Sequence, residues 1–428
     1  MSEAPWVACG AARLGVPQAD AFEPPAERVP LADLEAALAT AIARPLGAPR
    51  LREPARGARS VVVTIPDASR PCPGPLVLGA VLHELEAAGV SAGAVVVAIG
   101  CGLHATTHRA ERELLVGRAL ARRVEVIDAQ GIESEVADLG TTAAGAPVRI
   151  ARRVAAADLA ITVGIVEPHL YAGFSGGVKG VAIGCAGRET IAWTHRPAFI
   201  SAPGVALGKL HGNPFQSTLR EIAARTPLRW GVNLVVDDDG RAAGVGAGDP
   251  AAVQEALASA HAGAWLRSVE GRFDVVVAGV CRPKSDNLYQ ASRAATSIGL
   301  AARPAVEEGG LIVVCADLPD GVGRGPGELN FLAALEASSS PAELTARGLR
   351  EPLGPGGQRA FVVARVLERR RLAVVGAADP AFLAPLERLG VTAFDSVEAA
   401  LAAEDRRLGR RARVLAVADA LTTSVSAA

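Results

Sequence analysis

The strongest constraint on the fold is a regular alternation of short apolar runs with segments of helical periodicity. Runs rich in valine and isoleucine predict buried strands, because β-branched side chains pack well on a pleated sheet. The segments between them have the spacing of helices, and Gly89 suits the end of the first one. Such an order is typical of parallel α/β folds. In the first half, the predicted strands are 60–65, 94–99, 124–127, 159–166 and 230–236, and the predicted helices are 76–88, 109–120, 188–194 and 250–269.

A second series of strands and helices opens at residue 273. The chain has 428 residues, whereas single cores usually stop growing near about 250–300 residues. We therefore expect two α/β domains with mostly parallel sheets, residues 1–265 and a doubly wound 272–428, and an active-site cleft between them. The second half has predicted strands at 273–280, 311–315, 372–375 and 414–417, and predicted helices at 287–302, 327–337, 358–370, 380–389 and 397–404.

The composition narrows the functional classes. Lysine and arginine together number 44 against 45 acidic residues, so no net positive field favours nucleic acid. No apolar run approaches the roughly 18 residues of a membrane helix, and no basic leader predicts secretion. The six cysteines form no C-x-x-C pair, which argues against a zinc ribbon or a disulfide framework. We expect a cytoplasmic protein with reduced, mostly buried thiols that acts on a small molecule.

Lysine is rare in this chain. Only Lys179, Lys209 and Lys284 occur, and the other 41 basic residues are arginine. A codon bias that replaces lysine wherever a solvated charge suffices explains most of this imbalance. Each remaining lysine is then a candidate for a role that arginine cannot fill, because a lysine amine forms covalent bonds.

Polar side chains follow three of the predicted strands in the first half. Asp67 and Arg70 come after the first strand, His104 after the second, and His169 after the strand at 159–166. Ligands of α/β folds bind beyond the carboxyl ends of the strands. If these strands are parallel neighbours, the four side chains meet at one edge of the sheet.

A glycine-rich segment follows His169 and ends in Lys179. It contains Ser175, Gly176 and Gly177, and glycine lets backbone amides approach a phosphate closely. It is not a Walker loop, because that motif requires Gly where Val178 stands and Ser or Thr after the lysine. The segment stays a candidate for binding a phosphorylated cofactor.

The second domain offers a polar segment of its own at a strand end. Tyr289, Gln290 and Arg293 lie at the start of its first predicted helix, just after the strand at 273–280. Amide and guanidinium groups suit recognition of a carboxylate or hydroxyl, so we expect these residues to bind substrate.

Taken together, these segments resemble the nickel-dependent lactate racemase family, the LarA-like proteins. The resemblance spans most of the chain in the same order, and its block from 167 to 195 is highly specific. The matching segments are DASRPCP at 67–73, GLHATT at 102–107, EPHLYAGFSGGVKG at 167–180, GRETIAWTH at 187–195 and NLYQASR at 287–293.

The resemblance implies a cofactor, nickel pyridinium-3,5-bisthiocarboxylic acid mononucleotide, covalently tethered to Lys179. It makes His195 the nickel ligand and gives Asp67 a supporting place near the metal. Ser175, Gly176 and Gly177 belong to the cofactor-binding loop. Enzymes that synthesise this nickel-pincer nucleotide are implied partners, and the first domain becomes the catalytic and cofactor-tethering one.

For the reaction, the resemblance implies racemisation or epimerisation of a 2-hydroxy acid through a 2-keto acid, by reversible hydride transfer. His104 and His169 serve as the two acid/base groups, and histidine has a pKa near working pH. Arg70 binds the substrate carboxylate, while Gln290, Arg293 and Tyr289 contact substrate from the second domain.

Two positions depart from the family pattern. Arg293 stands where the lactate enzymes usually have lysine, and Gln358 or a neighbour replaces a tryptophan near the active site. Lysine and arginine are not equivalent at a substrate contact. The substrate is therefore lactate or a larger, more polar 2-hydroxy acid, such as a diacid or a sugar acid.

Two other functions remain open at the level of the sequence. The first is a zinc hydrolase with His104, His169 and His195 as ligands, although their spacing is not a known zinc signature. The second is a non-catalytic paralogue that binds or stores the cofactor.

Overall fold

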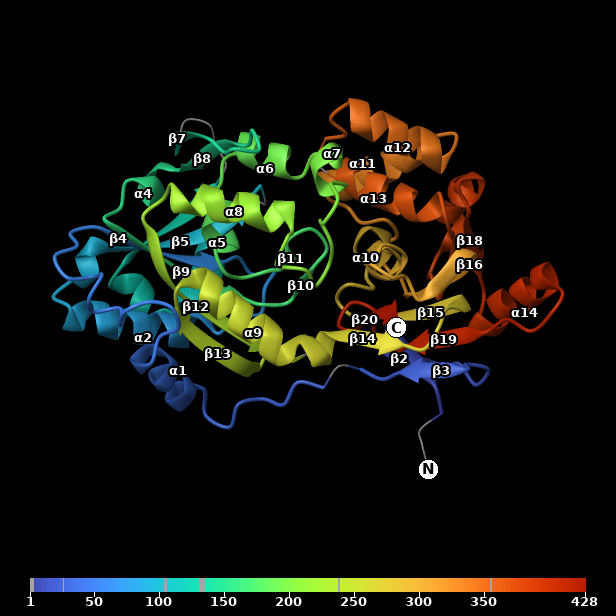
Figure 1. Ribbon diagram of the computed structural model, residues 1–428, viewed down its shortest axis with the longest axis horizontal. Helices are drawn as coiled ribbons and strands as arrows, with labels where there is room; N and C mark the ends of the chain where they lie inside the picture. Colours follow the sequence, from blue (N-terminus) through green and yellow to red (C-terminus); the bar gives the residue numbers. More distant parts are fainter. Residues whose placement is uncertain (1–3, 26, 104–105, 131–134, 238, 355) are drawn as a thin grey trace. The chain divides into compact units, whose positions relative to one another are not determined.

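A computed structural model describes residues 4–25, 27–103, 106–130, 135–237, 239–354 and 356–428 of the chain. The chain divides into two compact units (Figure 1). The central unit comprises residues 27–195 and 199–262. The terminal unit comprises the N-terminal residues up to 25, residues 196–198 and residues 263–428, so it contains both chain ends.

The central unit is built on a six-stranded sheet in the order β13-β12-β9-β4-β5-β6. Its strands are parallel except β13, which pairs antiparallel with β12. Their bounds are β4 (Val61–Pro66), β5 (Val95–Gly102), β6 (Glu125–Gln130), β9 (Leu159–Ile165), β12 (Leu228–Val236) and β13 (Ala242–Gly248). The small pairs are β7 (Val136–Thr141) with β8 (Pro147–Ala151), and β10 (Pro168–His169) with β11 (Gly173–Phe174).

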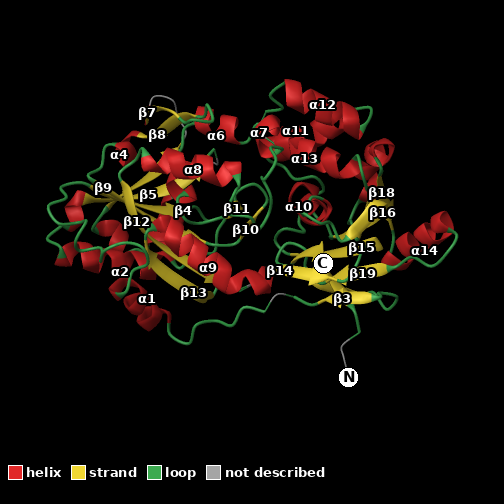
Figure 2. Cartoon of the chain, in the orientation of Figure 1, coloured by secondary structure: helices red, strands yellow, loops and turns green. Residues whose placement is uncertain are grey.

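Helices surround this sheet (Figure 2). Valine and isoleucine from the middle strands pack with leucines of α1 and α2 into one core. The α-helices of this unit are α1 (Leu34–Ala43), α2 (Gly74–Ala87), α3 (Arg109–Val116), α4 (Arg152–Ala155), α5 (Lys179–Ala182), α6 (Arg188–Thr194) and α8 (Pro214–Ala224). Two more helices, α7 (Pro197–Ile200) and α9 (Pro250–Trp265), each include residues of both units. Short 3-10 turns span Ala92–Ala94 and Leu120–Arg122.

The terminal unit has a second, mostly parallel sheet. Strands β18-β17-β16-β15 pair in that order, and β15 also pairs with β19 and β1. The bounds are β1 (Trp6–Gly10), β2 (Ala12–Gly15), β3 (Ala21–Glu23), β14 (Leu266–Val269), β15 (Phe273–Cys281), β16 (Val306–Cys315), β17 (Arg371–Val375), β18 (Val391–Phe394), β19 (Val414–Val417) and β20 (Ser424–Ala427).

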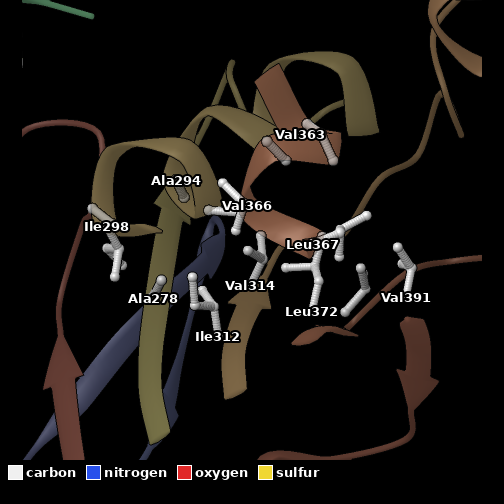
Figure 3. Close-up of a cluster of buried hydrophobic side chains, with 14 of the residues drawn as sticks. Ala278, Ala294, Ile298, Ile312, Val314, Val363, Val366, Leu367, Leu372 and Val391 are labelled. Atoms are coloured by element: carbon white, nitrogen blue, oxygen red, sulfur yellow. The ribbon is translucent and has the colours of Figure 1, made fainter. Parts of the chain in front are cut away.

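Two helices of this unit, α10 and α13, pack against the strands through apolar side chains (Figure 3). Ala294 and Ile298 come from α10, Val363 and Val366 from α13, and all four are buried. The helices of the unit are α10 (Leu288–Gly299), α11 (Pro326–Glu336), α12 (Pro341–Arg350), α13 (Gly357–Leu367), the 3-10 segment Pro380–Leu389 and α14 (Val397–Leu408).

The α/β class with mostly parallel sheets is confirmed. The chain ends differ from the predicted bounds of 1–265 and 272–428, because β1 and β3 pair with β15 and β19 of the terminal unit. The predicted helix 250–269 ends at Trp265, and the following four residues form β14, which pairs with β20. These pairings join residues hundreds of positions apart, which local periodicity does not reveal.

All six cysteines lie in the described part of the chain, and none of them is in a disulfide. Four are buried, whereas Cys72 is half-buried and Cys281 is exposed. Across the same described residues, no helix combines the length and the apolar character that crossing a membrane requires.

Candidate active site

The three strands that precede the candidate residues are neighbours. β4 pairs parallel with β5 on one side and with β9 on the other, so their carboxyl ends meet at one edge of the sheet. Asp67 and Arg70 follow β4, and His169 lies just after β9. His104 follows the end of β5 at Gly102 but lies outside the described residues. The predicted convergence of these strand ends is confirmed.

Arg70 is already oriented by a carboxylate. Its Nη1 donates to Oε1 of Glu167, and both side chains are about two-thirds buried. Asp67 accepts from the backbone N–H and the hydroxyl of Ser69, which closes a tight turn after the strand. Glu167 was absent from the predicted site. Its position between the end of β9 and His169 is the feature of the sequence that could have identified it.

The ring of His169 is anchored by backbone amides. Its Nδ1 accepts hydrogen bonds from the N–H groups of Tyr171 (3.3 Å) and Ala172 (3.1 Å). A ring nitrogen that accepts cannot carry the proton, so the neutral ring holds its proton on Nε2. His169 is thereby prepared to offer an N–H at Nε2.

His195 has the opposite arrangement. It follows the last residue of α6, and its Nδ1 lies 2.9 Å from the carbonyl oxygen of Ile191, so Nδ1–H donates there. The lone pair is then on Nε2, the form in which histidine binds metals. Burial lowers the pKa of His195 to about 4, a net value that includes the hydrogen bond to Ile191, which raises the pKa, and the positive charge of Lys179, which lowers it. The imidazole is therefore neutral at pH 7.

Two aromatic rings hold these histidines in one cluster. The ring centroid of Tyr171 lies 5.8 Å from that of His169 and 5.9 Å from that of His195, both edge-on. Phe215, from α8, lies 6.5 Å from the ring of His169 and 5.5 Å from that of His195. The fold thus brings His169, His195 and the charge of Lys179 into one neighbourhood.

The glycine-rich segment packs too closely for side chains. Gly176 has φ +75°, and a Cβ there would stand 2.3 Å from Oδ1 of Asn233. Gly177 donates its N–H to the same oxygen at 2.6 Å. The hydroxyl of Ser175 donates to Ile165 O (2.7 Å) and accepts from the N–H of Glu167 (3.0 Å), so it is engaged by the backbone. Because this hydroxyl is occupied, the predicted contact of Ser175 with a cofactor would have to come from its main chain.

Four buried amide side chains fix this segment, and the sequence analysis missed them. Gln254 donates to the carbonyl oxygens of residues 174 and 175, and Gln216 donates to Gln254 at 2.7 Å. Asn213 donates to the carbonyl of Tyr171 at 2.8 Å and caps α8. With Asn233, each is at most 1% exposed. The available signal was an amide inside the apolar strand β12, because buried amides need partners.

These observations suit a lysine-tethered, histidine-ligated metal cofactor. His195 presents Nε2 as a lone-pair donor, and its charge interaction places Lys179 nearby. No group of three His, Cys, Asp or Glu side chains with metal-binding geometry occurs among the described residues. The zinc-hydrolase hypothesis also requires His104 as a ligand, and His104 lies outside the described residues.

The three predicted substrate residues of the terminal unit lie together on α10. Asn287 caps this helix by accepting from the N–H of Gln290 at 2.9 Å. Arg293 then donates to Oε1 of Gln290 at 3.5 Å, one turn along the helix. Tyr289 packs edge-on against Phe331, with ring centroids 5.6 Å apart.

The chain is similar to known lactate racemases. Residues 13–208 match the lactate racemase N-terminal domain. The lactate racemase of Lactiplantibacillus plantarum is 28% identical over 385 residues, covering 88% of this chain and 87% of that protein. The lactate racemase of Thermoanaerobacterium thermosaccharolyticum is 28% identical over 342 residues, covering 78% of each. The chain is thus similar to lactate racemases over most of its length.

Two solved structures share the fold of this chain. The lactate racemase apoprotein from T. thermosaccharolyticum matches with a TM-score of 0.86 and 23% identity, covering 99% of this chain and all of that one. A protein from Thermotoga maritima matches with a TM-score of 0.61 and 14% identity, covering 88% and 97%. The racemase-domain match contains every candidate residue of the central unit, whereas Tyr289, Gln290 and Arg293 lie beyond residue 208.

Proposed function

We propose that this protein is an isomerase, a racemase or epimerase of a 2-hydroxy acid. The likeness to lactate racemases over most of the chain supports this reaction class. The single observation that carries the proposal is the opposite hydrogen bonding of two histidines in one aromatic cluster. His195 presents a lone pair at Nε2 that suits a metal, and His169 presents an N–H at Nε2 that suits a substrate oxygen.

The cofactor of the proposal is a nickel-pincer nucleotide. Lys179 would hold it covalently, His195 would coordinate its nickel through Nε2, and the main chain at Gly176 and Gly177 would lie against it. When bound, this group supplies a reversible hydride acceptor, which the amino acids of the chain do not provide. Asp67 would support the site near the metal.

The chain itself would bind substrate and move protons. Arg70, oriented by Glu167, would hold the substrate carboxylate through paired N–H donors. One of His104 and His169, with its Nε2 unprotonated, would take the hydroxyl proton as hydride leaves carbon, and the other, as an imidazolium, would return a proton to the keto oxygen. In the tautomer set by its hydrogen bonds, His169 would hydrogen-bond to the substrate oxygen through Nε2–H. Two acid/base groups are required because inversion exposes both faces of the planar 2-keto acid. Gln290, Arg293 and Tyr289 would complete the substrate contacts.

The direct test uses protein from a host that carries the cofactor-synthesis enzymes. Single enantiomers of a panel of 2-hydroxy acids are incubated with it, and chiral chromatography follows the second isomer. We expect His169→Gln to reduce turnover about 100-fold or more while the mass adduct on Lys179 stays. Turnover by wild-type protein of no acid in the panel would contradict the proposal.

The two open alternatives predict other results. A zinc hydrolase would carry stoichiometric zinc and an unmodified Lys179. A non-catalytic paralogue would carry the adduct and nickel yet convert no substrate. Protein made without the synthesis enzymes should be inactive under the proposal.

A further inference from the structure

The ion pair between Arg70 and Glu167, both in the central unit, engages only part of the guanidinium. Nη1 of Arg70 donates to Oε1 of Glu167. In the described part of the chain, Nε and Nη2 of Arg70 have no hydrogen-bond partner, and the side chain is 30% exposed. Since a guanidinium carries five N–H donors, the edge formed by Nε and Nη2 is available to a ligand.

The main chain of Glu167 is held at both of its polar groups by Ser175. The backbone N–H of Ser175 donates to the carbonyl oxygen of Glu167 at 2.8 Å, and the hydroxyl of Ser175 accepts from the N–H of Glu167 at 3.0 Å. These bonds extend the pairing of β10 with β11, in which Pro168 lies opposite Phe174. The carboxylate of Glu167 therefore reaches Arg70 from a backbone whose position is fixed.

The same hairpin carries His169, which has a separate anchor. Glu167 and His169 are two residues apart, a spacing that puts side chains on the same side of an extended strand. The ring of His169 is held by the N–H groups of Tyr171 and Ala172, and these bonds do not involve Glu167. Loss of the Glu167 carboxylate should therefore release Arg70 without releasing the ring of His169.

We propose that Glu167 is a positioning residue, which holds Arg70 by Nη1 so that the Nε–Nη2 edge receives the substrate carboxylate. This inference rests on the proposed function, in which Arg70 binds that carboxylate. The Nε–Nη2 edge offers two parallel N–H donors, which match the two oxygens of a carboxylate. A guanidinium that is already oriented loses less side-chain freedom when the acid binds. Glu167 therefore raises the affinity for the acid and leaves the chemical step to other groups.

The test measures acid binding at Arg70 without depending on turnover. Phenylglyoxal modifies guanidinium groups, and peptide mass spectrometry of the cofactor-loaded protein gives its rate at Arg70 in increasing lactate, malate or gluconate. At least one acid should protect Arg70 in the wild-type protein. The concentration for half protection should rise roughly threefold to tenfold in Glu167→Ala. Glu167→Gln, whose amide oxygen still accepts from Nη1, should stay within about twofold of wild type or bind more tightly, because it removes a repelling charge.

Glu221→Ala is the matched control. Glu221 pairs with Arg225 at 3.1 Å in the same unit, and each side chain is 34% exposed, so the substitution removes a similar ion pair and should leave the protection of Arg70 unchanged. For an acid that is converted, Glu167→Ala should raise KM and change kcat by less than about threefold. Thermal unfolding should show that every variant is folded.

Three results would overturn the inference while the proposed function stands. They are half protection of Arg70 at the same concentration in Glu167→Ala as in wild type, an equal loss in Glu167→Gln, and turnover of an acid that does not protect Arg70. Protection by none of the acids, together with turnover of none in the wider panel, would contradict the proposed function and the inference with it.

Discussion

At the scale of single residues, the two described histidines differ in what they can do because their Nδ1 atoms meet different backbone groups. His195 meets a carbonyl and His169 meets two amides. Both residues could be identified from the sequence, but the ring nitrogen that carries the proton in each could not. The difference depends on how α6 ends and on how the chain turns after His169.

This difference between the two histidines predicts that bound nickel can be lost without loss of the adduct on Lys179. His195→Ala should lower bound nickel by about tenfold or more, because the metal loses a ligand, while the mass adduct on Lys179 stays. Metal analysis and intact mass on the same sample measure both quantities. His211→Ala is the control, since His211 is exposed. Full nickel content in His195→Ala would remove His195 from the ligand set.

Gly176 gives a second prediction at this scale. Gly176→Ala should destabilise the protein by about 2–4 kcal/mol, since it adds strain at φ +75° and a clash with Asn233. Urea unfolding measures the change. Gly79→Ala is the matched control, because a Cβ there meets nothing within 4 Å and Gly79 lies inside α2. The control should stabilise by about 0.5–1 kcal/mol, and a similar loss in both variants would refute the packing argument.

At the scale of elements, sequence predicted what depends on local periodicity. The helix 188–194 and the strand at 273–280 were predicted almost to the residue. Elements with weak or misleading local signals were missed, among them α12 and the strand β14, which the helical pattern of α9 concealed. The amides that hold the glycine-rich segment were missed because they lie far from it in the sequence. Asn233 and Gln254 lie in separate elements, and only the fold brings them to Gly177 and Ser175.

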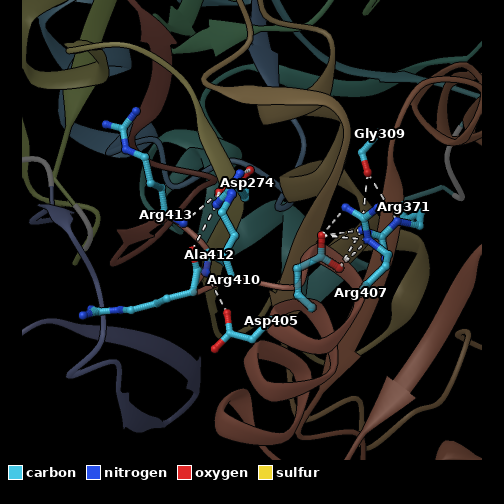
Figure 4. A network of polar contacts seen from close by, with 10 residues as sticks. Asp274, Gly309, Arg371, Asp405, Arg407, Arg410, Ala412 and Arg413 are labelled. Carbon is cyan, nitrogen blue, oxygen red and sulfur yellow. Dashed lines mark hydrogen bonds and ion pairs between the residues drawn. The ribbon is translucent and has the colours of Figure 1, made fainter.

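One ion-pair cluster between elements carries a pH prediction. Glu404 of α14 is 1% exposed and accepts hydrogen bonds from Arg371, at the start of β17, and from Arg407 (Figure 4). Burial alone would raise the pKa of Glu404, but these hydrogen bonds hold it below its usual value. The cluster therefore stabilises the folded state fully above about pH 4.3. That contribution disappears as pH falls through the lowered pKa.

Glu404→Gln should consequently lower stability by on the order of 2–4 kcal/mol at pH 7. The difference from wild type should shrink at pH 3.5, below the ordinary glutamate pKa of about 4.3, because the contribution declines as pH falls toward the lowered pKa. Thermal unfolding at both values measures this, and the exposed Glu368→Gln serves as control. A difference that stays constant or grows on acidification would contradict the assignment.

At the scale of the whole molecule, the chain starts and ends in the same unit. β1 and β3 complete the sheet of the terminal unit, since they pair with β15 and β19. The boundary predicted from the alternation of strands and helices placed these residues with the other sheet, because pairing between distant strands leaves no local pattern. The order of strands in a sheet depends on pairing between residues far apart in the sequence, which local patterns do not reveal.

Removal of residues 1–25 should therefore destabilise the terminal unit selectively. Hydrogen exchange should accelerate at β15 and β19, which lose strand partners, and stay unchanged at β4 and β5 of the central unit. Exchange followed by peptide mass spectrometry distinguishes the two units. Faster exchange at β4 and β5, with β15 protected as before, would contradict the observed pairing.

The central claim is that Lys179 tethers a nickel cofactor in a 2-hydroxy-acid isomerase, and peptide-resolved mass analysis tests it most directly. Protein from a host with the cofactor-synthesis enzymes should carry one adduct, located on Lys179, with one nickel per chain. Lys179→Arg should keep the charge and lose the adduct, because a guanidinium does not form the covalent link. An unmodified Lys179 in active protein, or an adduct on another residue, would contradict the account.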